Sequence, residues 1–254
     1  MNFWFLLPAV LSLISFFGTW TVYGLALANR HVCPLDNWQY TNSCSLNSTE
    51  RCCTIRHIPF ISVSFYSTCG MNAPENALFS ATLNSGAILL LVFCIFQHAH
   101  IIKKNNDNVT LSRIGLAVGC LSSFGAFITG NCNPGTLMVL HYVGAALCFV
   151  STCLYTLIMS ILTYRCFVTG LEYILAPIRT ISTAIQITAT IFYIVFFPQE
   201  TYDYQHISAI FEWILATNIQ LFELSFVVEF YYFSASMLSV LISKDEEETS
   251  LIMS

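Results

Sequence analysis

The chain has 254 residues, of which 56% are hydrophobic and 9% are charged, and its formal net charge is −5. A soluble domain with so few charges would expose an aggregation-prone surface, so the composition excludes an ordinary soluble protein and predicts an integral membrane protein. Much of the acidic excess comes from one cluster at residues 245–248, and no basic patch indicates nucleic-acid binding.

The apolar runs predict an all-α polytopic membrane protein with six transmembrane helices, because about 20 apolar residues are enough to cross the hydrocarbon layer. We predict a single six-span domain over residues 1–254, with spans at about 3–28, 75–100, 114–130, 136–164, 180–197 and 206–233. The first run has no basic residue before it and is longer than the apolar core of a usual signal peptide, so we expect it to be retained.

The segment between the first two spans, residues 29–74, is polar and contains five cysteines and a glycosylation sequon at Asn47. Cysteines gathered in one polar segment indicate an oxidising compartment. Five cysteines cannot all pair with one another, and Cys132, on the same side of the membrane, would make six. We predict that Cys132 either bonds a loop cysteine or stays free at the membrane edge. The disulfide candidates are Cys33, Cys44, Cys52, Cys53, Cys69 and Cys132.

The run from Ile114 to Tyr164 contains no Asp, Glu, Lys or Arg and is too long for a single crossing. Turn-forming residues occur within it at 131–135, where Pro134 removes a backbone donor. We therefore predict an antiparallel helical hairpin. Small residues at a helical spacing in its first span predict close approach of another helix, from this chain or from a second one. They are Gly115, Gly119, Ser123 and Ala126.

Basic residues in short loops predict the orientation, because such loops stay in the cytosol. The residues on one side are Lys103, Lys104, Arg113, Arg165 and Arg179. The loops at 131–135 and 198–205 have no Lys or Arg. We therefore expect both termini in the cytosol and residues 29–74 outside it. Cys166 then lies at the cytosolic interface and is a palmitoylation candidate, with an inert thiol as the alternative.

The last span contains three acidic residues, and an ionisable group at bilayer depth is costly. Glu212 and Glu223 are eleven residues apart and share a helix face, whereas Glu229 is rotated by about 100°. This pattern predicts either a path for ions or protons, or a structural arrangement in which Glu223 alone lies deep and pairs with another span. His141 and Arg179 are possible partners by residue type.

The C-terminal tail, residues 234–254, begins with an apolar extension and then becomes acidic. Glu247, Leu251 and Ile252 fit an acidic dileucine sorting signal for endosomes or lysosomes, and a chance match is the alternative. The chain has no nucleophile elbow, HExxH, P-loop or dinucleotide motif. The sequence therefore predicts no enzyme, and we expect no catalytic residue, metal site or cofactor.

Several short segments occur in order over nearly the whole chain. They are Trp20-Thr21-Val22-Tyr23, Cys69-Gly70, Pro74-Glu75, Asn84, Gly130-Asn131, His141-Tyr142-Val143-Gly144-Ala145, Arg179, Glu212-Trp213 and Glu229-Phe230. Together they resemble the damage-regulated autophagy modulator and transmembrane protein 150 family, the animal relatives of the yeast Sfk-type proteins. The loop stretch His31-Val32-Cys33-Pro34, with Asn37-Trp38 and Cys52-Cys53-Thr54, looks closest to the transmembrane protein 150A branch.

The resemblance implies a six-span, non-catalytic regulator or scaffold with cytosolic termini. For the 150A branch it implies phosphoinositide supply at the plasma membrane, through recruitment of a phosphatidylinositol 4-kinase complex. For the autophagy-modulator branch it implies an endosomal or lysosomal protein that works with autophagy or trafficking machinery. An ion channel or transporter subunit is a further alternative. The partner and the oligomeric state do not follow from the sequence.

Overall fold

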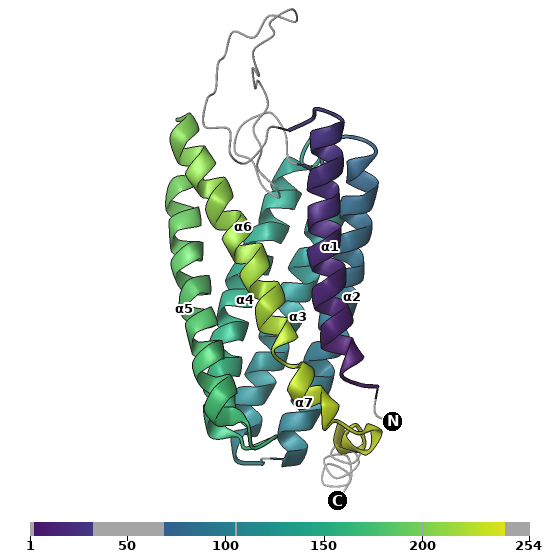
Figure 1. Ribbon diagram of the computed structural model, residues 1–254, viewed down its shortest axis with the longest axis vertical. Helices are drawn as coiled ribbons and strands as arrows, with labels where there is room; N and C mark the ends of the chain where they lie inside the picture. Colours follow the sequence, from purple (N-terminus) through teal and green to yellow (C-terminus); the bar gives the residue numbers. More distant parts are fainter. Residues whose placement is uncertain (1–2, 33–68, 105, 200, 242–254) are drawn as a thin grey trace, which may run out of the picture.

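The computed structural model describes residues 3–32, 69–104, 106–199 and 201–241, which form a bundle of long helices running along one axis (Figure 1). The six long helices are α1 (Leu6–Ala28), α2 (Glu75–Lys104), α3 (Val109–Asn131), α4 (Met138–Arg165), α5 (Glu172–Phe196) and α6 (Tyr202–Leu224). Shorter elements are η1 (Asn106–Asn108), α7 (Val227–Tyr231) and η2 (Ala235–Met237). No strand occurs in these described ranges.

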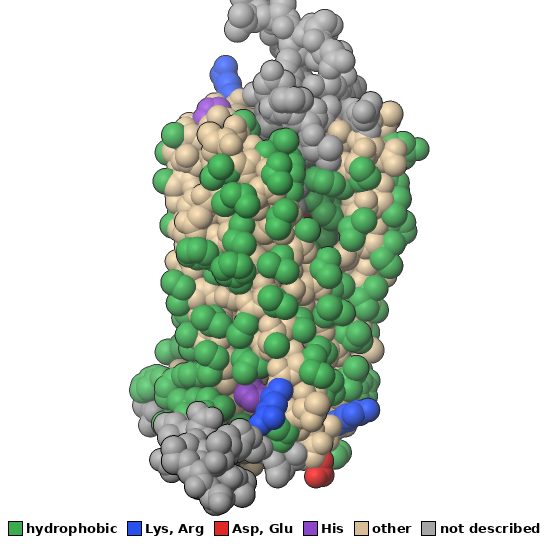
Figure 2. All heavy atoms as spheres, turned by 180° about the vertical axis from the view of Figure 1, so that it is seen from behind, with side chains coloured by type: hydrophobic (Ala, Val, Ile, Leu, Met, Phe, Trp, Pro, Cys, Tyr) green, Lys and Arg blue, Asp and Glu red, His purple; other side chains and the backbone are tan. Residues whose placement is uncertain are grey.

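Six helical stretches are long and apolar enough to cross a membrane, the last of them combining α6 and α7. Their 23 to 30 residues correspond to about 35–45 Å of helix, which exceeds the hydrocarbon thickness of about 30 Å. Large apolar side chains such as Phe17, Ile88 and Ile181 are more than half exposed on the bundle exterior. Figure 2 shows hydrophobic side chains spread over the surface between the two ends. The all-α, six-span prediction is therefore confirmed.

The two ends of the bundle differ in charge. Exposed basic side chains at one end belong to Lys103, Lys104, Arg113 and Arg165, and we call this the basic end. The opposite end carries residues 29–32 and the turn at 132–137, and we call it the loop end. Because six crossings return the chain to its starting side, the first described residue, Phe3, and α7 both lie at the basic end (Figure 1).

The turn between α3 and α4 lies where Pro134 and its neighbours predict it. Helix α3 ends at Asn131 and α4 begins at Met138. The side-chain oxygen of Asn133 accepts a hydrogen bond from the backbone N–H of Gly135 at 2.7 Å, and its carbonyl accepts one from Leu137 at 2.7 Å. Such local side-chain bonds are the reason that Asn favours turns.

Helix α5 begins earlier than the sequence analysis expected, at Glu172 rather than at residue 180. The Glu172 carboxylate accepts hydrogen bonds from the backbone N–H groups of Val168 and Thr169 at 2.7 and 2.6 Å. These bonds hold the chain just before the helix against its first residue. Pro177 therefore lies inside α5 rather than in a connector. The last predicted span is also interrupted, because α6 ends at Leu224 and α7 begins at Val227.

The small residues of α3 serve contacts within the chain. Side chains of α2 and α4 lie against Gly119, where a methyl group would be 3.1 Å from the Tyr155 ring. Ser123 donates a hydrogen bond of 2.7 Å to the backbone carbonyl of Ala87 on α2. Helix α3 thus packs closely between α2 and α4, so the seam expected from the sequence is an internal one.

Gly125 is the tightest point of the α3–α4 contact and supplies a test of it. A methyl group there would lie 2.5 Å from the backbone nitrogen of Cys148 and 2.7 Å from the carbonyl oxygen of Gly144. We expect Gly125→Ala to lower the free energy of unfolding by about 1–3 kcal/mol, because α4 backbone must shift.

Gly24 on α1 is the matched control, since nothing lies within 4 Å of the same added methyl group. Gly24→Ala should change the stability by less than about 1 kcal/mol. Thermal unfolding of the purified variants in one detergent measures both effects, and equal melting temperatures would contradict the close α3–α4 packing.

Candidate functional site

A buried ion pair joins α5 to α7 near the basic end. Nη1 of Arg179 lies 2.5 Å from Oε1 of Glu229, and the two side chains are 1% and 4% exposed. Arg179 also donates to the hydroxyl groups of Thr163 and Ser225 at 2.8 and 2.9 Å. Its guanidinium carbon lies 3.5 Å from the centre of the Phe226 ring. The cation is therefore surrounded by partners from α4, α7 and the break between α6 and α7.

The second oxygen of Glu229 is bonded as well. Gln97 of α2 donates a hydrogen bond of 2.7 Å to Oε2 of Glu229. A buried carboxylate that is paired and hydrogen-bonded on both oxygens has its charge compensated in place. We infer that this group holds α2, α4, α5 and α7 together, and that it is not a step in an ion path. Arg179 was expected in the connector just before the fifth span, and this was wrong, because α5 begins at Glu172 and Arg179 lies completely buried within it.

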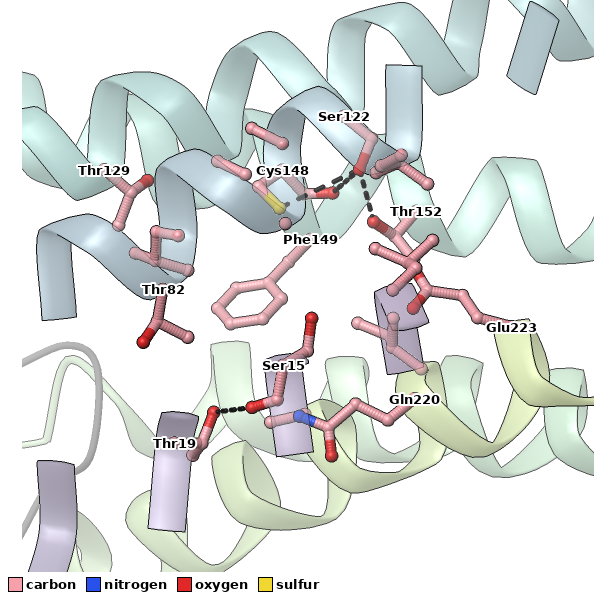
Figure 3. A pocket seen from close by; sticks show the side chains of 18 of the residues that line it. Ser15, Thr19, Thr82, Ser122, Thr129, Cys148, Phe149, Thr152, Gln220 and Glu223 are labelled. Carbon is pink, nitrogen blue, oxygen red and sulfur yellow. Dashed lines mark hydrogen bonds between the residues drawn. The ribbon is translucent and has the colours of Figure 1, made fainter. Parts of the chain in front are cut away.

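A cavity of about 130 Å³ lies between α1, α2, α3, α4 and α6. Figure 3 shows Ser15 and Gln220 on one side of it and Phe149 and Thr82 on the other. Its lining includes Leu90 and Thr152, which are close to the midpoints of α2 and α4. The cavity therefore lies near the middle of the bundle, at the depth of the hydrocarbon layer.

Glu223 of α6 lines this cavity and is 6% exposed. None of the described residues forms a hydrogen bond or ion pair with its carboxyl group. Pairing of Glu223 with another span was one expectation from the sequence, with His141 and Arg179 as partners by residue type. The structure gives both of these side chains other contacts. Glu212 is also fully buried, but it is not among the lining residues of the cavity.

Three residues from the family segments meet at the loop end. Asn84 and Asn131 exchange side-chain hydrogen bonds of 3.2 and 2.7 Å, which joins α2 to the end of α3. The Nδ1 atom of His141 lies 2.7 Å from the carbonyl oxygen of Cys132. These side chains therefore hold the α3–α4 turn against the neighbouring helices, which is a structural role.

Two further family residues stabilise the contacts of α1. Glu75 is fully buried, and one of its oxygens accepts a hydrogen bond from the Asn29 side chain at 2.6 Å and lies 3.1 Å from Nδ1 of His31. Trp213 of α6 packs against Trp20, with ring centres 4.6 Å apart. Glu75 thus binds the end of α1 to the start of α2, and Trp213 binds α6 to α1.

The described cysteines outside the helices differ in surroundings. Burial raises the pKa of the Cys69 thiol well above its usual range. Cys132 is half-buried and bonds no cysteine of the described ranges. Cys166 is buried, and desolvation raises its pKa to about 11. Palmitoylation of Cys166 therefore requires the segment between α4 and α5 to move away from the bundle.

Other predicted site residues lie outside the described ranges. They are Cys33, Cys44, Cys52, Cys53, Asn47, Glu247, Leu251 and Ile252. The disulfides, the glycosylation site and the sorting signal consequently stay predictions.

Sequence reasoning missed the neutral partners of the ion pair and the cavity. Gln97, Thr163 and Ser225 carry no motif, and their only signal is that they are polar residues within apolar runs. The cavity arises where small residues of different helices face one another, as Gly86, Ala126 and Ala216 do. A single sequence contains no record of which helices meet.

These features define a six-helix membrane bundle with a polar core. A family model described as "Frag1/DRAM/Sfk1/Cwh43P N-terminal domain" matches residues 3–233. The chain therefore belongs to the Frag1/DRAM/Sfk1 family, as the sequence resemblance predicted.

Curated relatives include proteins named Transmembrane protein 150A and TMEM150B. Transmembrane protein 150A of Xenopus laevis is 34% identical over 91% of this chain and 84% of its own length. The Homo sapiens protein of the same name is 32% identical over the same shares. Modulator of macroautophagy TMEM150B-A of Xenopus laevis is 29% identical over 90% of this chain and 87% of its own. No solved structure matches the chain.

The ion pair can be tested by removing one member. Arg179→Met leaves the Glu229 carboxylate buried without its cation, and we expect the free energy of unfolding to fall by about 3–5 kcal/mol. The free energy of unfolding should fall less in the double variant Arg179→Met, Glu229→Leu than in the single variant, because neither charge remains buried. Thermal unfolding in detergent measures both.

Arg165→Met is the matched control, because Arg165 is exposed at the end of α4. Its effect should stay within about 0.5 kcal/mol. A single variant Arg179→Met as stable as the parent would show that the buried pair does not support the bundle.

Proposed function

We propose that this protein is a non-enzymatic membrane regulator that recruits a phosphatidylinositol 4-kinase complex and so supports phosphoinositide supply at the plasma membrane. Its similarity to Transmembrane protein 150A over most of both chains supports this choice of branch. The observation that carries the proposal is the basic end, where exposed Lys and Arg side chains lie beside segments held in place by hydrogen bonds and a buried ion pair.

The basic end is suited to face the cytosol. Lys103 and Lys104 end α2, Arg113 lies in the second turn of α3, and Arg165 ends α4. Within the described residues, Arg30 is the one exposed basic residue of the loop end. Figure 2 shows this unequal distribution. Because short cytosolic loops are enriched in Lys and Arg, we place the basic end and both termini in the cytosol.

The segments at the basic end are held in place, as a binding surface requires. Glu172 fixes the segment before α5 through two backbone hydrogen bonds. The Arg179–Glu229 pair fixes α7. After α7, the ring of Phe233 stacks on Phe96 of α2 with centres 5.4 Å apart. A partner would therefore meet a preformed basic surface beside the inner leaflet, where anionic lipid headgroups add to the attraction.

Charge reversal on this surface tests the proposal. We expect Lys103→Glu, Lys104→Glu to weaken co-purification of the kinase complex with the full-length protein by about tenfold, because two attractive charges become repulsive. The pool of phosphatidylinositol 4-phosphate at the plasma membrane should fall with it. Arg30→Glu, at the loop end, is the matched control and should change neither. Unchanged recruitment by the double variant would contradict the proposal.

The alternative function is modulation of autophagy at endosomes or lysosomes. Its support is the printed name of the TMEM150B relatives, "Modulator of macroautophagy", together with the dileucine pattern ending in Leu251 and Ile252. The two functions differ in the membrane they need, so the location of the protein discriminates between them.

We expect the tagged full-length protein and its Leu251→Ala, Ile252→Ala variant to reside at the plasma membrane alike, if the dileucine pattern is a chance match. Fluorescence microscopy with surface biotinylation measures this. A parent protein in lysosomes and a variant at the cell surface would instead establish the sorting signal and favour the autophagy function.

A further inference from the structure

The central cavity is a candidate binding site that the proposed scaffold function does not use. Five helices contribute to its wall, and α5 does not. Its volume of about 130 Å³ is close to that of an engineered protein cavity of about 150 Å³ that binds benzene. The space therefore suits a compact molecule with about one ring or a short chain.

Two neighbouring residues of α6 bring hydrogen-bonding groups to the cavity wall. Glu223 is 6% exposed, and no described residue forms a hydrogen bond or ion pair with its carboxyl group. Gln220 lies one turn before it on α6 and lines the same space. The backbone carbonyl of Gln220 accepts a hydrogen bond from the Ser12 hydroxyl group. The side-chain amide of Gln220 has no hydrogen-bond partner within the described residues. Two hydrogen-bonding groups thus face the cavity together (Figure 3).

The other polar groups of the wall are mainly hydroxyl groups, and those of Ser15 and Thr82 also line the cavity (Figure 3). The hydroxyl groups of Thr19 and Thr129 donate to backbone carbonyls of their own helices at 2.7 and 2.8 Å. The hydroxyl groups of Ser122 and Thr152 bond each other at 2.6 Å. A calcium-type site would need six to eight oxygen ligands directed inward. The remaining wall includes Leu11, Leu83, Leu90, Phe149 and Ile219, which favours an apolar occupant.

A buried polar group is stabilised when it gains a hydrogen bond, and leaving it unmade costs about 1–3 kcal/mol. Carboxyl and amide oxygens both accept hydrogen bonds. Because the Gln220 amide also donates through its NH2 group, an occupant that satisfies this site combines an apolar body with a group that both donates and accepts hydrogen bonds, as a hydroxyl group does.

We propose that this cavity binds a compact lipophilic alcohol, with its hydroxyl group donating to Glu223 or Gln220 and its apolar body lying between Leu83 and Phe149. Such a molecule enters from the bilayer, into which it partitions. The binding site is independent of the basic end, so its failure would leave the recruitment proposal untouched.

The test uses the full-length protein in nanodiscs and a diazirine-bearing hexanol as the photoreactive probe. Labelling mapped by mass spectrometry should saturate on peptides of α4 and α6 that contain Phe149 and Gln220. An excess of cyclohexanol should compete with it. A diazirine-bearing hexane of the same length, which lacks the hydroxyl group, should label these peptides at least tenfold less.

Three variants relate the labelling to the site. Glu223→Leu should weaken probe binding at least tenfold, whereas Glu223→Gln, which keeps an acceptor oxygen, should stay within about threefold of the parent. Ala216→Leu extends a side chain into the cavity and should abolish saturable labelling. Leu121→Phe, on the exposed face of α3, is the matched control and should not change it.

Thermal unfolding shows whether each variant is folded. If Glu223→Leu does not fold, the labelling of Ala216→Leu tests the site instead. Equal, non-saturable labelling of all variants by both probes would overturn the proposal and indicate partition into the bilayer alone. Absence of labelling together with a proton flux that Glu223→Gln abolishes would also overturn it, in favour of a path for protons.

Discussion

The Arg179–Glu229 ion pair is the interaction on which the basic half of this bundle depends. Opposite charges in a low-dielectric interior are tolerated when each is paired and its remaining donors and acceptors are bonded. Here Gln97, Thr163 and Ser225 complete that requirement from three different parts of the chain. If α2, α4, α5 or α7 moved, a buried charge would lose a partner. The pair therefore fixes the relative positions of these helices, including α7, after which the chain leaves the bundle.

The middle of the bundle is built in a different way. Small side chains from neighbouring helices leave a cavity there, and Glu223 faces it without a cation. Two of the intramembrane carboxyl groups, those of Glu229 and Glu223, therefore have opposite surroundings although they are six residues apart on the same segment. Six residues of helix already place the two side chains on different faces, and Glu229 lies on α7 while Glu223 lies on α6.

Several polar residues of the described part of the bundle serve packing. At the loop end, Asn84, Asn131 and His141 hold a turn, and Glu75 holds the end of α1. A rigid bundle of this kind carries its specificity on the surfaces it presents at its ends. The basic end supplies such a surface, on which the proposed recruiting function rests.

The sequence by itself determined the six crossings, the α3–α4 turn and the family, because membrane helices follow local apolar composition and turns follow local residue chemistry. It did not determine the start of α5 at Glu172, whose carboxylate bonds the backbone of residues 168 and 169. It named Arg179, Glu223 and Glu229 as polar residues within or beside spans but left their partners open. Only the tertiary structure decided the partners of these residues and the place of the cavity, because Arg179 and Glu229 are fifty residues apart and five helices form the cavity wall.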